Sequence, residues 1–314
     1  MPRTWRLWPF LWWVLQGGAV NGRRVRIWLK GALAAIGVAV LTAGCGKQYV
    51  VLHPAGPVAQ QELNLMVLVT IAMAVIIVPV IALFLYTLWK FRDRPGNKAP
   101  YMPTWRHNKR LELIVWVVPA IIVVWISIPT VGETFSLTHL PKAADPVTID
   151  VTSVDYKWLF EYPAQHVATV NYVVMPKGVP VLFELTANSP MNTFWVPQLG
   201  GMEYTMPGRV LPLWLEASRT GVFWGHSGQF SGVWFEKMFF TVRSVNHSTF
   251  NAWVSKARKS APMTLADYYR LLKPTVVGVK TFGAYPADTF PSTTHGFTLK
   301  GGMYLVPHDN PREN

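Results

Sequence analysis

The sequence predicts a membrane α-helical hairpin followed by an all-β sandwich, with a short helical extension at the carboxyl end. Three observations carry this prediction. Two long apolar runs, at 63–88 and 111–131, contain between them a single charged residue. Short β-rich runs separated by Pro, Gly and Asn then follow over 146–245. Helical patterns return only after that stretch.

The composition is typical of a chain that is partly embedded in a membrane. Of its 314 residues, 51% are hydrophobic and 14% are charged, which fits one ordinary globular domain plus membrane segments. The net charge of +13 is concentrated in residues 1–130, where 14 Lys and Arg stand against 3 Asp and Glu. The basic charge therefore flanks the membrane segments, and no nucleic-acid partner is expected.

The first 44 residues have the order of a secretory signal peptide: a basic region, an apolar run and then small residues. Because the small residues end at Cys45, the segment resembles a bacterial lipoprotein signal. Cys45 would then be lipidated and would begin an exported segment over 45–62, with its acyl chains adding to membrane attachment. The alternative is an uncleaved anchor helix with a buried cysteine.

The two apolar runs are each long enough to cross a bilayer, which takes roughly 20 residues. The loop between them, 89–110, carries seven basic residues and one acid, and such an excess marks the cytoplasmic side. The hairpin 63–131 therefore has both ends outside the cytoplasm, in agreement with export from Cys45. Glu112, at the membrane edge, is expected to turn outward or to pair with neighbouring basic residues.

The region 146–245 is expected to form the sandwich. Its strand-like runs alternate apolar and polar residues or are rich in β-branched residues. Gly178 and Pro180 indicate a hairpin turn, and Pro207-Gly208 a second turn. The expected strands lie at 148–154, 171–175, 179–185, 221–224 and 235–242.

Residues 246–314 are expected to form a helical extension and an irregular tail. Ser248 or Thr249 can cap a helix that runs to Ala257. Thr264 and Asp267 have the spacing of a capping box before a second helix. From Pro274 onward Gly, Pro and Thr dominate, which favours a tail without regular structure.

The sandwich region also repeats the spacing of a metal site that lacks its ligands. Ser227, Ser231, Phe235 and Met238 resemble the Cys-x3-Cys-x3-His-x2-Met signature of the dinuclear copper centre in cytochrome c oxidase subunit II. Serine occupies both cysteine positions, phenylalanine occupies the histidine position, and only the methionine remains. Gln229 stands where that family has a Glu that lends its backbone carbonyl.

Two further motifs extend the resemblance to roughly residues 60–255. The aromatic run at 154–162, which includes Tyr156 and Trp158, is similar to a strand of oxidase subunit II. The segment 192–197 is similar to its His-Ser-Trp-x-x-Pro motif, which places the family's first copper histidine on Asn192. The chain is thereby identified as a member of the haem-copper oxidase subunit II superfamily, and the resemblance implies a cupredoxin-like sandwich. Tyr156 and Trp158 are expected to pack at a subunit interface.

The missing ligands indicate a branch of that superfamily. Two bridging thiolates are needed for a dinuclear copper centre, and serine hydroxyls are hard, weak ligands that cannot replace them. Cys45 is the only cysteine, so a blue-copper site near His226 is not expected either. The resemblance is therefore to subunit II of the bacterial quinol oxidases, and it implies no cofactor in this chain.

The same resemblance implies the role and the location. Haems and copper would lie in subunit I, and the whole complex would convert quinol and oxygen to quinone and water with proton translocation. Expected partners are subunit I, the other subunits, membrane lipid and, through the complex, quinol, but not cytochrome c. The chain is expected in the bacterial inner membrane with its carboxyl-terminal domain in the periplasm. The alternatives are a cytochrome c oxidase subunit II and a free-standing cupredoxin-like lipoprotein.

Overall fold

The computed structural model describes most of the chain beyond residue 48, in the ranges 49–100, 108–138, 145–188, 190–287, 289–290, 299–300 and 303–305. The chain divides into two compact units, Met1–Tyr49 and Val50–Asn314, and every helix and strand described below belongs to the second. The signal peptide expected over 1–44 and Cys45 lie outside the described residues.

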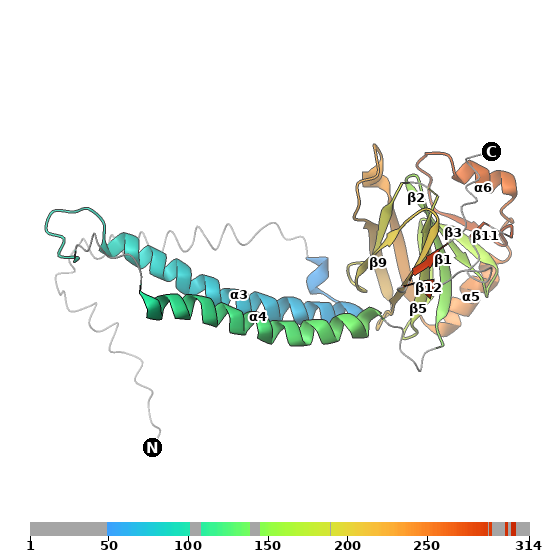
Figure 1. The fold of residues 1–314 in the computed structure, drawn as a ribbon. Coiled ribbons are helices and arrows are strands. Elements are labelled where there is room, and N and C mark those ends of the chain that lie inside the picture. The colour runs from blue at the N-terminus through green and yellow to red at the C-terminus, as the bar shows by residue number, and fades with distance from the viewer. Residues whose placement is uncertain are drawn as a thin grey trace, which may run out of the picture. The chain divides into compact units, whose positions relative to one another are not determined.

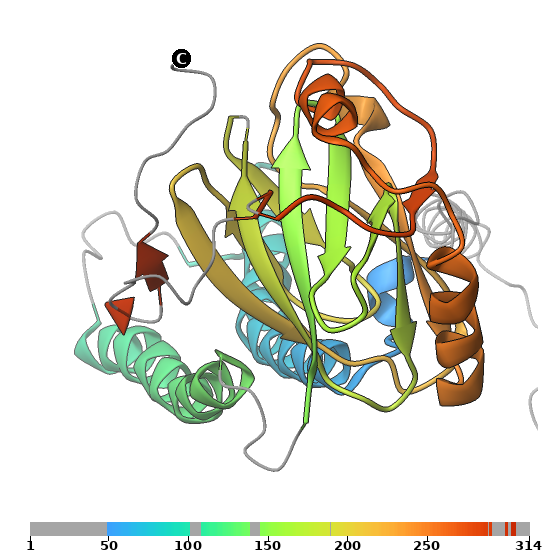
Figure 2. The same cartoon turned by 90° about the vertical axis from the view of Figure 1, so that its right-hand side faces the viewer.

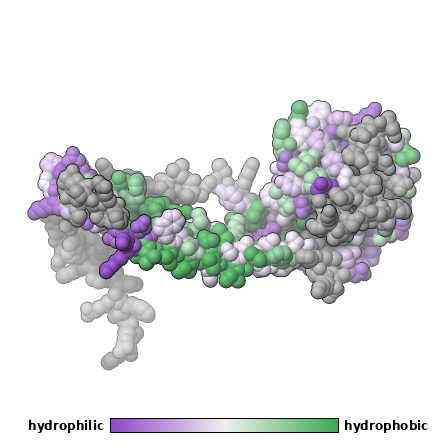
Figure 3. Space-filling view, in the orientation of Figure 1, coloured by the Kyte–Doolittle hydropathy of each residue, from purple (hydrophilic) through white to green (hydrophobic). Residues whose placement is uncertain are grey.

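Two long helices, α3 (Pro57–Lys90) and α4 (Lys109–Thr138), form the hairpin (Figure 1). Pro57 begins α3 because its fixed φ suits the first helical position and no backbone N–H is needed there. Both helices are long and apolar enough to cross a membrane, and their apolar side chains face outward (Figure 3). Each predicted span lies inside one of these helices. Glu112, in the first turn of α4, is exposed and forms no ion pair with a described residue.

The start of α3 is joined to the sandwich through backbone hydrogen bonds. A short 3-10 helix, η1 (Val50–Leu52), precedes it. The N–H of Ala55 donates to the carbonyl of Gln198, and the carbonyl of Ala55 accepts from the N–H of Ser218, both at 2.7 Å. Gly56 follows, and a Cβ at that position would lie 2.1 Å from the carbonyl oxygen of Glu216. Only glycine permits this approach, so the junction depends on it.

The sandwich consists of two sheets. The eight-stranded sheet has the order β11-β3-β2-β1-β5-β8-β13-β12, and the five-stranded sheet has the order β4-β10-β9-β6-β7. The pairs β1/β5 and β4/β10 are parallel, and the other neighbours are antiparallel. The strands of the first sheet are β1 (Val147–Val154), β2 (Lys157–Tyr162), β3 (Val167–Val170), β5 (Val181–Ala187), β8 (Arg209–Leu215), β11 (Lys280–Phe282), β12 (Leu299–Lys300) and β13 (Met303–Leu305). Those of the second are β4 (Tyr172–Pro176), β6 (Asn192–Trp195), β7 (Met202–Thr205), β9 (Gly221–Ser227) and β10 (Phe239–Val245).

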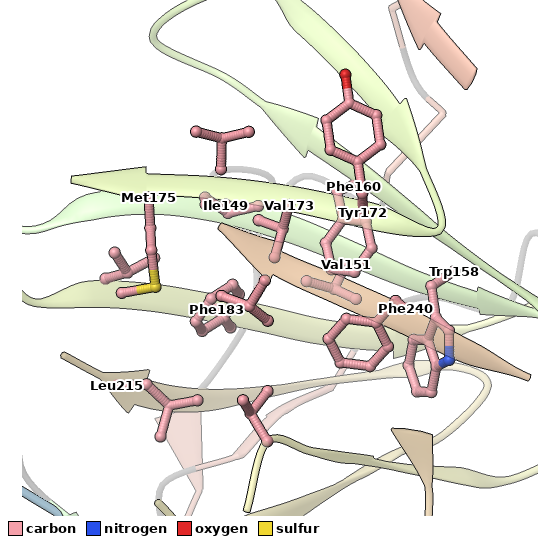
Figure 4. Close-up of a cluster of buried hydrophobic side chains, with 14 of the residues drawn as sticks. Ile149, Val151, Trp158, Phe160, Tyr172, Val173, Met175, Phe183, Leu215 and Phe240 are labelled. Atoms are coloured by element: carbon pink, nitrogen blue, oxygen red, sulfur yellow. The ribbon is translucent and has the colours of Figure 1, made fainter. Parts of the chain in front are cut away.

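Aromatic side chains from both sheets fill the space between them (Figure 4). Trp158 and Phe160 of β2 meet Phe240 of β10, with ring centroids 5.3 Å apart in each case. Phe194 of β6 stacks on Phe240 at 4.8 Å. All four side chains are fully buried. Aromatic burial of this kind contributes strongly to stability, because each ring removes a large apolar area from water.

Two expectations about the strands are wrong. Phe235–Lys237 forms a 3-10 helix, η2, and β10 begins only at Phe239. The 3-10 turn of η2 is closed by the N–H of Lys237, which donates to the carbonyl of Trp234, and by the N–H of Met238, which donates to that of Phe235, both at 2.9 Å. The turn at Gly178 makes no hairpin, because β4 and β5, which it connects, belong to different sheets. The second error arises because the local pattern does not specify which strands pair.

The carboxyl-terminal extension is more ordered than expected. The first helix, α5 (His247–Ala257), begins after Asn246, so the predicted cap at Ser248 or Thr249 is wrong. The second, α6 (Leu265–Leu271), has the predicted capping box, in which the hydroxyl of Thr264 accepts from the N–H of Asp267. Beyond Pro274 the chain is not wholly irregular, because β11, β12 and β13 join the eight-stranded sheet.

The extension is held on the outer face of the eight-stranded sheet by a second apolar cluster. Tyr268 and Leu271 of α6 pack there against Leu159 and Val170. Figure 2 shows the chain after α5 running past the eight-stranded sheet, whereas α5 itself contacts β4 of the five-stranded sheet. Val277, Phe282 and Tyr285 of the tail pack against the same cluster, and this partial burial favours an ordered strand at Lys280–Phe282.

Candidate functional site

The six positions of the copper signature lie at one end of the five-stranded sheet. Asn192 begins β6 and Ser227 ends β9, and these strands are antiparallel neighbours with Phe194 opposite Ser227. The sheet therefore brings the two side chains together, and the hydroxyl of Ser227 donates to Oδ1 of Asn192 at 3.1 Å. Both are buried, with exposures of 4% and 0%.

Ser227 is the centre of a polar network. Its Oγ accepts from the N–H of Thr193 at 3.4 Å and from the N–H of Gln229 at 3.3 Å. Its single hydroxyl proton can go to Asn192 or to the carbonyl of Gln229, also at 3.1 Å. The hydroxyl of Thr193 accepts from the N–H of Gly228 at 2.6 Å. The hydrogen-bonding capacity of Ser227 is thus taken up by the protein itself.

The side chains of the other three positions are not part of this network, although the carbonyl of Met238 accepts from the N–H of Ser227 at 3.4 Å. Ser231 has a buried hydroxyl without a partner among the described residues. Phe235 is half-buried in η2, with its ring 5.7 Å from that of Phe230. Met238 is 1% exposed and belongs to the core cluster of the sandwich. The structure therefore joins Asn192, Ser227 and Gln229 and separates Ser231 and Phe235 from them.

The side chains at these positions do not fit a dinuclear copper centre. Such a centre requires soft thiolates and imidazoles, whereas these positions offer hydroxyls, amide oxygens and a phenyl ring. His226 is a residue of strand β9, and its ring packs edge-on against Trp195 at 5.0 Å. Within the described parts of the chain, no three His, Cys, Asp or Glu side chains are placed to hold a metal ion.

Tyr156 and Trp158, which were expected in one aromatic strand, occupy two different environments, because Tyr156 lies in the turn between β1 and β2 and Trp158 lies in β2. Trp158 is fully buried inside the sandwich, so the expectation that it packs at a subunit interface is wrong. Its Nε1 donates to the carbonyl of Met238 at a long 3.5 Å. Tyr156, with φ of 66°, is half-buried and packs edge-on at 5.4 Å against Trp234 of the loop between β9 and η2, residues 228–234.

Thr193, which sequence reasoning missed, fixes the start of the same loop, because its hydroxyl accepts from the N–H of Gly228. A lone threonine beside Asn192 gives no local signal of this contact.

Comparison with known proteins decides the family. Residues 126–245 match the family described as cytochrome c oxidase subunit II, periplasmic domain, and residues 48–132 match its transmembrane domain. Quinol oxidase subunit 2 of Bacillus cereus is 41% identical over 263 residues, which cover 82% of this chain and 90% of that protein. The chain belongs to the oxidase subunit II family. With α3 and α4, the match to the transmembrane domain makes it a membrane protein.

Other members of the subunit II family are also similar. Cytochrome bo(3) ubiquinol oxidase subunit 2 of Pseudomonas aeruginosa is 37% identical over 76% of this chain and 72% of that protein. Ubiquinol oxidase subunit 2 of Acetobacter aceti is 35% identical over 80% and 82%. The crystal structure of the periplasmic domain of subunit II of cytochrome oxidase from Bradyrhizobium japonicum is 26% identical, covers 38% of this chain and 98% of that one, and gives a TM-score of 0.37. The family assignment rests on the sequence matches.

Near the polar network, several large apolar side chains of this subunit II are exposed, and together they are here called the site surface. It comprises Phe230, Val233 and Trp234 of the loop with Trp224, Phe239 and Met202 of the neighbouring strands. Val233 is 84% exposed and Phe230 is 76% exposed. Patches of several large apolar side chains on one face commonly mark contacts with another protein.

Alanine substitution should have different effects on stability at Ser227 and Ser231, the two positions of this subunit II that correspond to the cysteines of the copper signature. Ser227→Ala removes a hydroxyl that serves two buried N–H groups and Asn192, so we expect a loss of about 1–3 kcal/mol in the free energy of unfolding. Ser231→Ala removes a hydroxyl with no described partner and should change it by less than about 0.5 kcal/mol. Urea denaturation of the full chain in detergent measures both. Equal losses would contradict the network.

A second polar cluster lies on the outer face of the eight-stranded sheet. Asp150 of β1 stands directly opposite Glu161 of β2 and Glu184 of β5. Asp150 and Glu184 line a cavity of about 860 Å³ with Tyr285 and Thr289. Burial raises the pKa of Glu161 to about 7, although a hydrogen bond from Thr289 opposes the shift. Burial and the two neighbouring carboxylates raise the pKa of Asp150 to about 8. Burial also raises the pKa of Glu184.

Proposed function

We propose that this chain is the copper-free subunit II of a proton-translocating quinol oxidase of the aerobic respiratory chain. One observation carries the proposal: the four ligand positions Asn192, Ser227, Ser231 and Phe235 hold neither thiolate nor imidazole, in a chain whose relatives are named quinol oxidase subunit 2. Quinol and oxygen would be converted to quinone and water in a haem- and copper-bearing subunit I. This chain would contribute no redox group.

A membrane-soluble donor agrees with this chemistry. Copper in subunit II serves to accept electrons from a donor in the aqueous phase, and these side chains cannot hold it. A quinol reaches the complex through the bilayer, so an electron acceptor in the exported domain is not needed. The tight packing of Ser227 and Asn192 supports a structural role for the former ligand positions.

The role proposed for the chain is structural and in assembly. The hairpin of α3 and α4 has outward-facing apolar side chains that would pack against subunit I and lipid. The site surface, which includes Phe230 and Val233, would cover the periplasmic face of subunit I. Burial of such side chains at an interface is favourable because it removes apolar area from water.

The topology belongs to the same proposal. The basic loop 89–110 would lie in the cytoplasm, and the sandwich in the periplasm. Cys45 would carry the lipid after removal of residues 1–44. Mass spectrometry of the mature amino terminus tests this part: a lipidated Cys45 is expected, and an intact terminus upstream of it would contradict processing there.

The test of the proposed activity compares two electron donors. The complex purified through this chain is expected to consume oxygen with a quinol and not with reduced cytochrome c. The full chain purified alone is expected to bind no stoichiometric copper and to show no near-infrared copper absorption. Bound dinuclear copper with cytochrome c activity would favour the cytochrome c oxidase alternative. Purification without a haem-bearing partner would favour the free-standing lipoprotein.

A further inference from the structure

The chain that follows α3 folds back on the helix end and lines an open, basic pocket. Asn97 organises this turn: its side-chain amide donates to the carbonyl of Lys90 at 3.1 Å and to that of Arg92 at 2.8 Å. Its Oδ1 accepts from the N–H of Ala99 at 3.0 Å. Gly96, with φ of 82°, allows the reversal. The helix end is thereby capped and the loop is held in a defined shape.

The pocket has a volume of about 450 Å³ and is lined by ten residues between Trp89 and Pro100. Four of them are basic, namely Lys90, Arg92, Arg94 and Lys98, and none is acidic. No described carboxylate lies within ion-pair distance of any of the four. Asp93 of the same loop does not line the pocket and forms no ion pair with these four side chains, so the lining itself carries a net positive charge.

Aromatic rings position two of these cations. The guanidinium of Arg92 lies 6.0 Å from the ring of Trp89, and the ammonium of Lys90 lies 5.3 Å from that of Tyr86. Trp89 and Tyr86 are themselves 64% and 50% exposed. Tryptophan and tyrosine at the end of an apolar helix are typical of the layer where lipid headgroups begin.

We propose that this pocket is a binding site for the phosphate headgroup of an anionic phospholipid. Arginine and lysine donors fit phosphate oxygens, and uncompensated cations favour a headgroup with net negative charge over a zwitterionic one. The acyl chains would lie on the apolar side of α3, where Leu85 and Leu88 are 58% and 55% exposed. This site is independent of which donor the complex oxidises.

The test is native mass spectrometry of the complex in mild detergent, titrated with dioleoyl phosphatidylglycerol or dioleoyl phosphatidylcholine. We expect tighter binding of phosphatidylglycerol. In Arg92→Gln/Arg94→Gln its affinity should fall about 30-fold, because two cations near the headgroup are lost. The matched control is Lys109→Gln/Arg110→Gln, which removes two cations at the start of α4 that do not line the pocket. It should retain the affinity within about two-fold.

A third variant distinguishes binding in a folded pocket from non-specific attraction by the basic loop. Asn97→Ala keeps every cation but removes the hydrogen bonds that close the loop, so the affinity for phosphatidylglycerol should fall at unchanged net charge. An equal loss in both charge variants, or no loss in Asn97→Ala, would overturn the proposal. Inorganic phosphate that binds more tightly than phosphatidylglycerol, and displaces it at equal concentration, would assign the pocket to free phosphate and overturn the lipid assignment. Retained haem content shows that each complex is intact.

Discussion

Replacing Trp158 with alanine is expected to lower the free energy of unfolding of this chain by about 4 kcal/mol. The side chain is fully buried between the sheets, and its ring contacts Phe194 at 5.5 Å and Phe240 at 5.3 Å. Its removal leaves a large cavity, and the packed rings around it cannot collapse fully into that space. Urea denaturation of the full chain in detergent, followed by far-UV circular dichroism, measures the loss.

The matched control is Trp224→Ala, which removes the same side chain from an exposed position of β9. Trp224 is 59% exposed, so its loss should change the free energy of unfolding by less than about 0.5 kcal/mol. If the two variants lose the same stability, the placement of Trp158 in the core is contradicted.

A third variant separates packing from electron transfer. Trp158→Phe keeps an aromatic ring in the core, and the complex that contains it should retain quinol oxidation if its assembly is normal. Normal assembly with a large loss of turnover would instead indicate an electron path through Trp158. This comparison bears directly on the proposed absence of a redox role for the sandwich.

The carboxylate row on the eight-stranded sheet should make stability depend on pH. Glu161 is fully buried and Asp150 lies opposite it, and both have raised pKa values, about 7 and about 8. The folded state therefore holds protons that the unfolded state releases above its ordinary carboxyl pKa. The contribution of these two protonated carboxyls to the free energy of unfolding is fully present below about pH 4, and it is lost as pH rises through about 7 to 8.

The size of the loss follows from the shift of Glu161, from 4.5 to about 7. Each unit corresponds to about 1.4 kcal/mol, so roughly 3 kcal/mol of stability depends on this carboxyl. In Glu161→Gln the side chain stays neutral at every pH, and the difference in unfolding free energy between acid and alkaline buffer should shrink by about that amount. Urea denaturation across this pH range measures it.

Other groups around the row must be included in the interpretation. Asp150 and Glu184 also have raised pKa values, so part of the pH dependence remains in Glu161→Gln. Glu236→Gln, which removes an exposed carboxylate from η2, is the control and should leave the pH profile unchanged. A wild-type chain whose stability is constant or rises from acid to alkaline pH would contradict the prediction.

The hairpin could be predicted because its signal is local. A run of apolar residues at 63–88 is long enough to span a bilayer whatever surrounds it, and α3 contains that run entirely. The capping box at Thr264 and Asp267 is likewise formed within one turn of chain and was found where the pattern indicated it. Both features depend on residues that are close in sequence.

The identity of the side chains in the copper signature is also a property of the sequence alone. The serines at 227 and 231 cannot supply thiolates in any fold. Their identity at these spacings therefore excludes a dinuclear copper centre before the structure is known. Their different surroundings could not be predicted in this way. Ser227 is bonded to Asn192 because β6 and β9 are neighbours, whereas Ser231 lies in a loop outside the network.

Tertiary structure decided what depends on pairing between distant strands. Asp150, Glu161 and Glu184 each stand at a polar position of an alternating strand, but only the register of β2, β1 and β5 places them in one row. The same applies to Trp158, which lies in the core and not at an interface. The amino-acid sequence thus determined the membrane segments, the family and the missing ligands. Strand order and register determined which of these side chains meet, because those contacts arise between segments far apart along the chain.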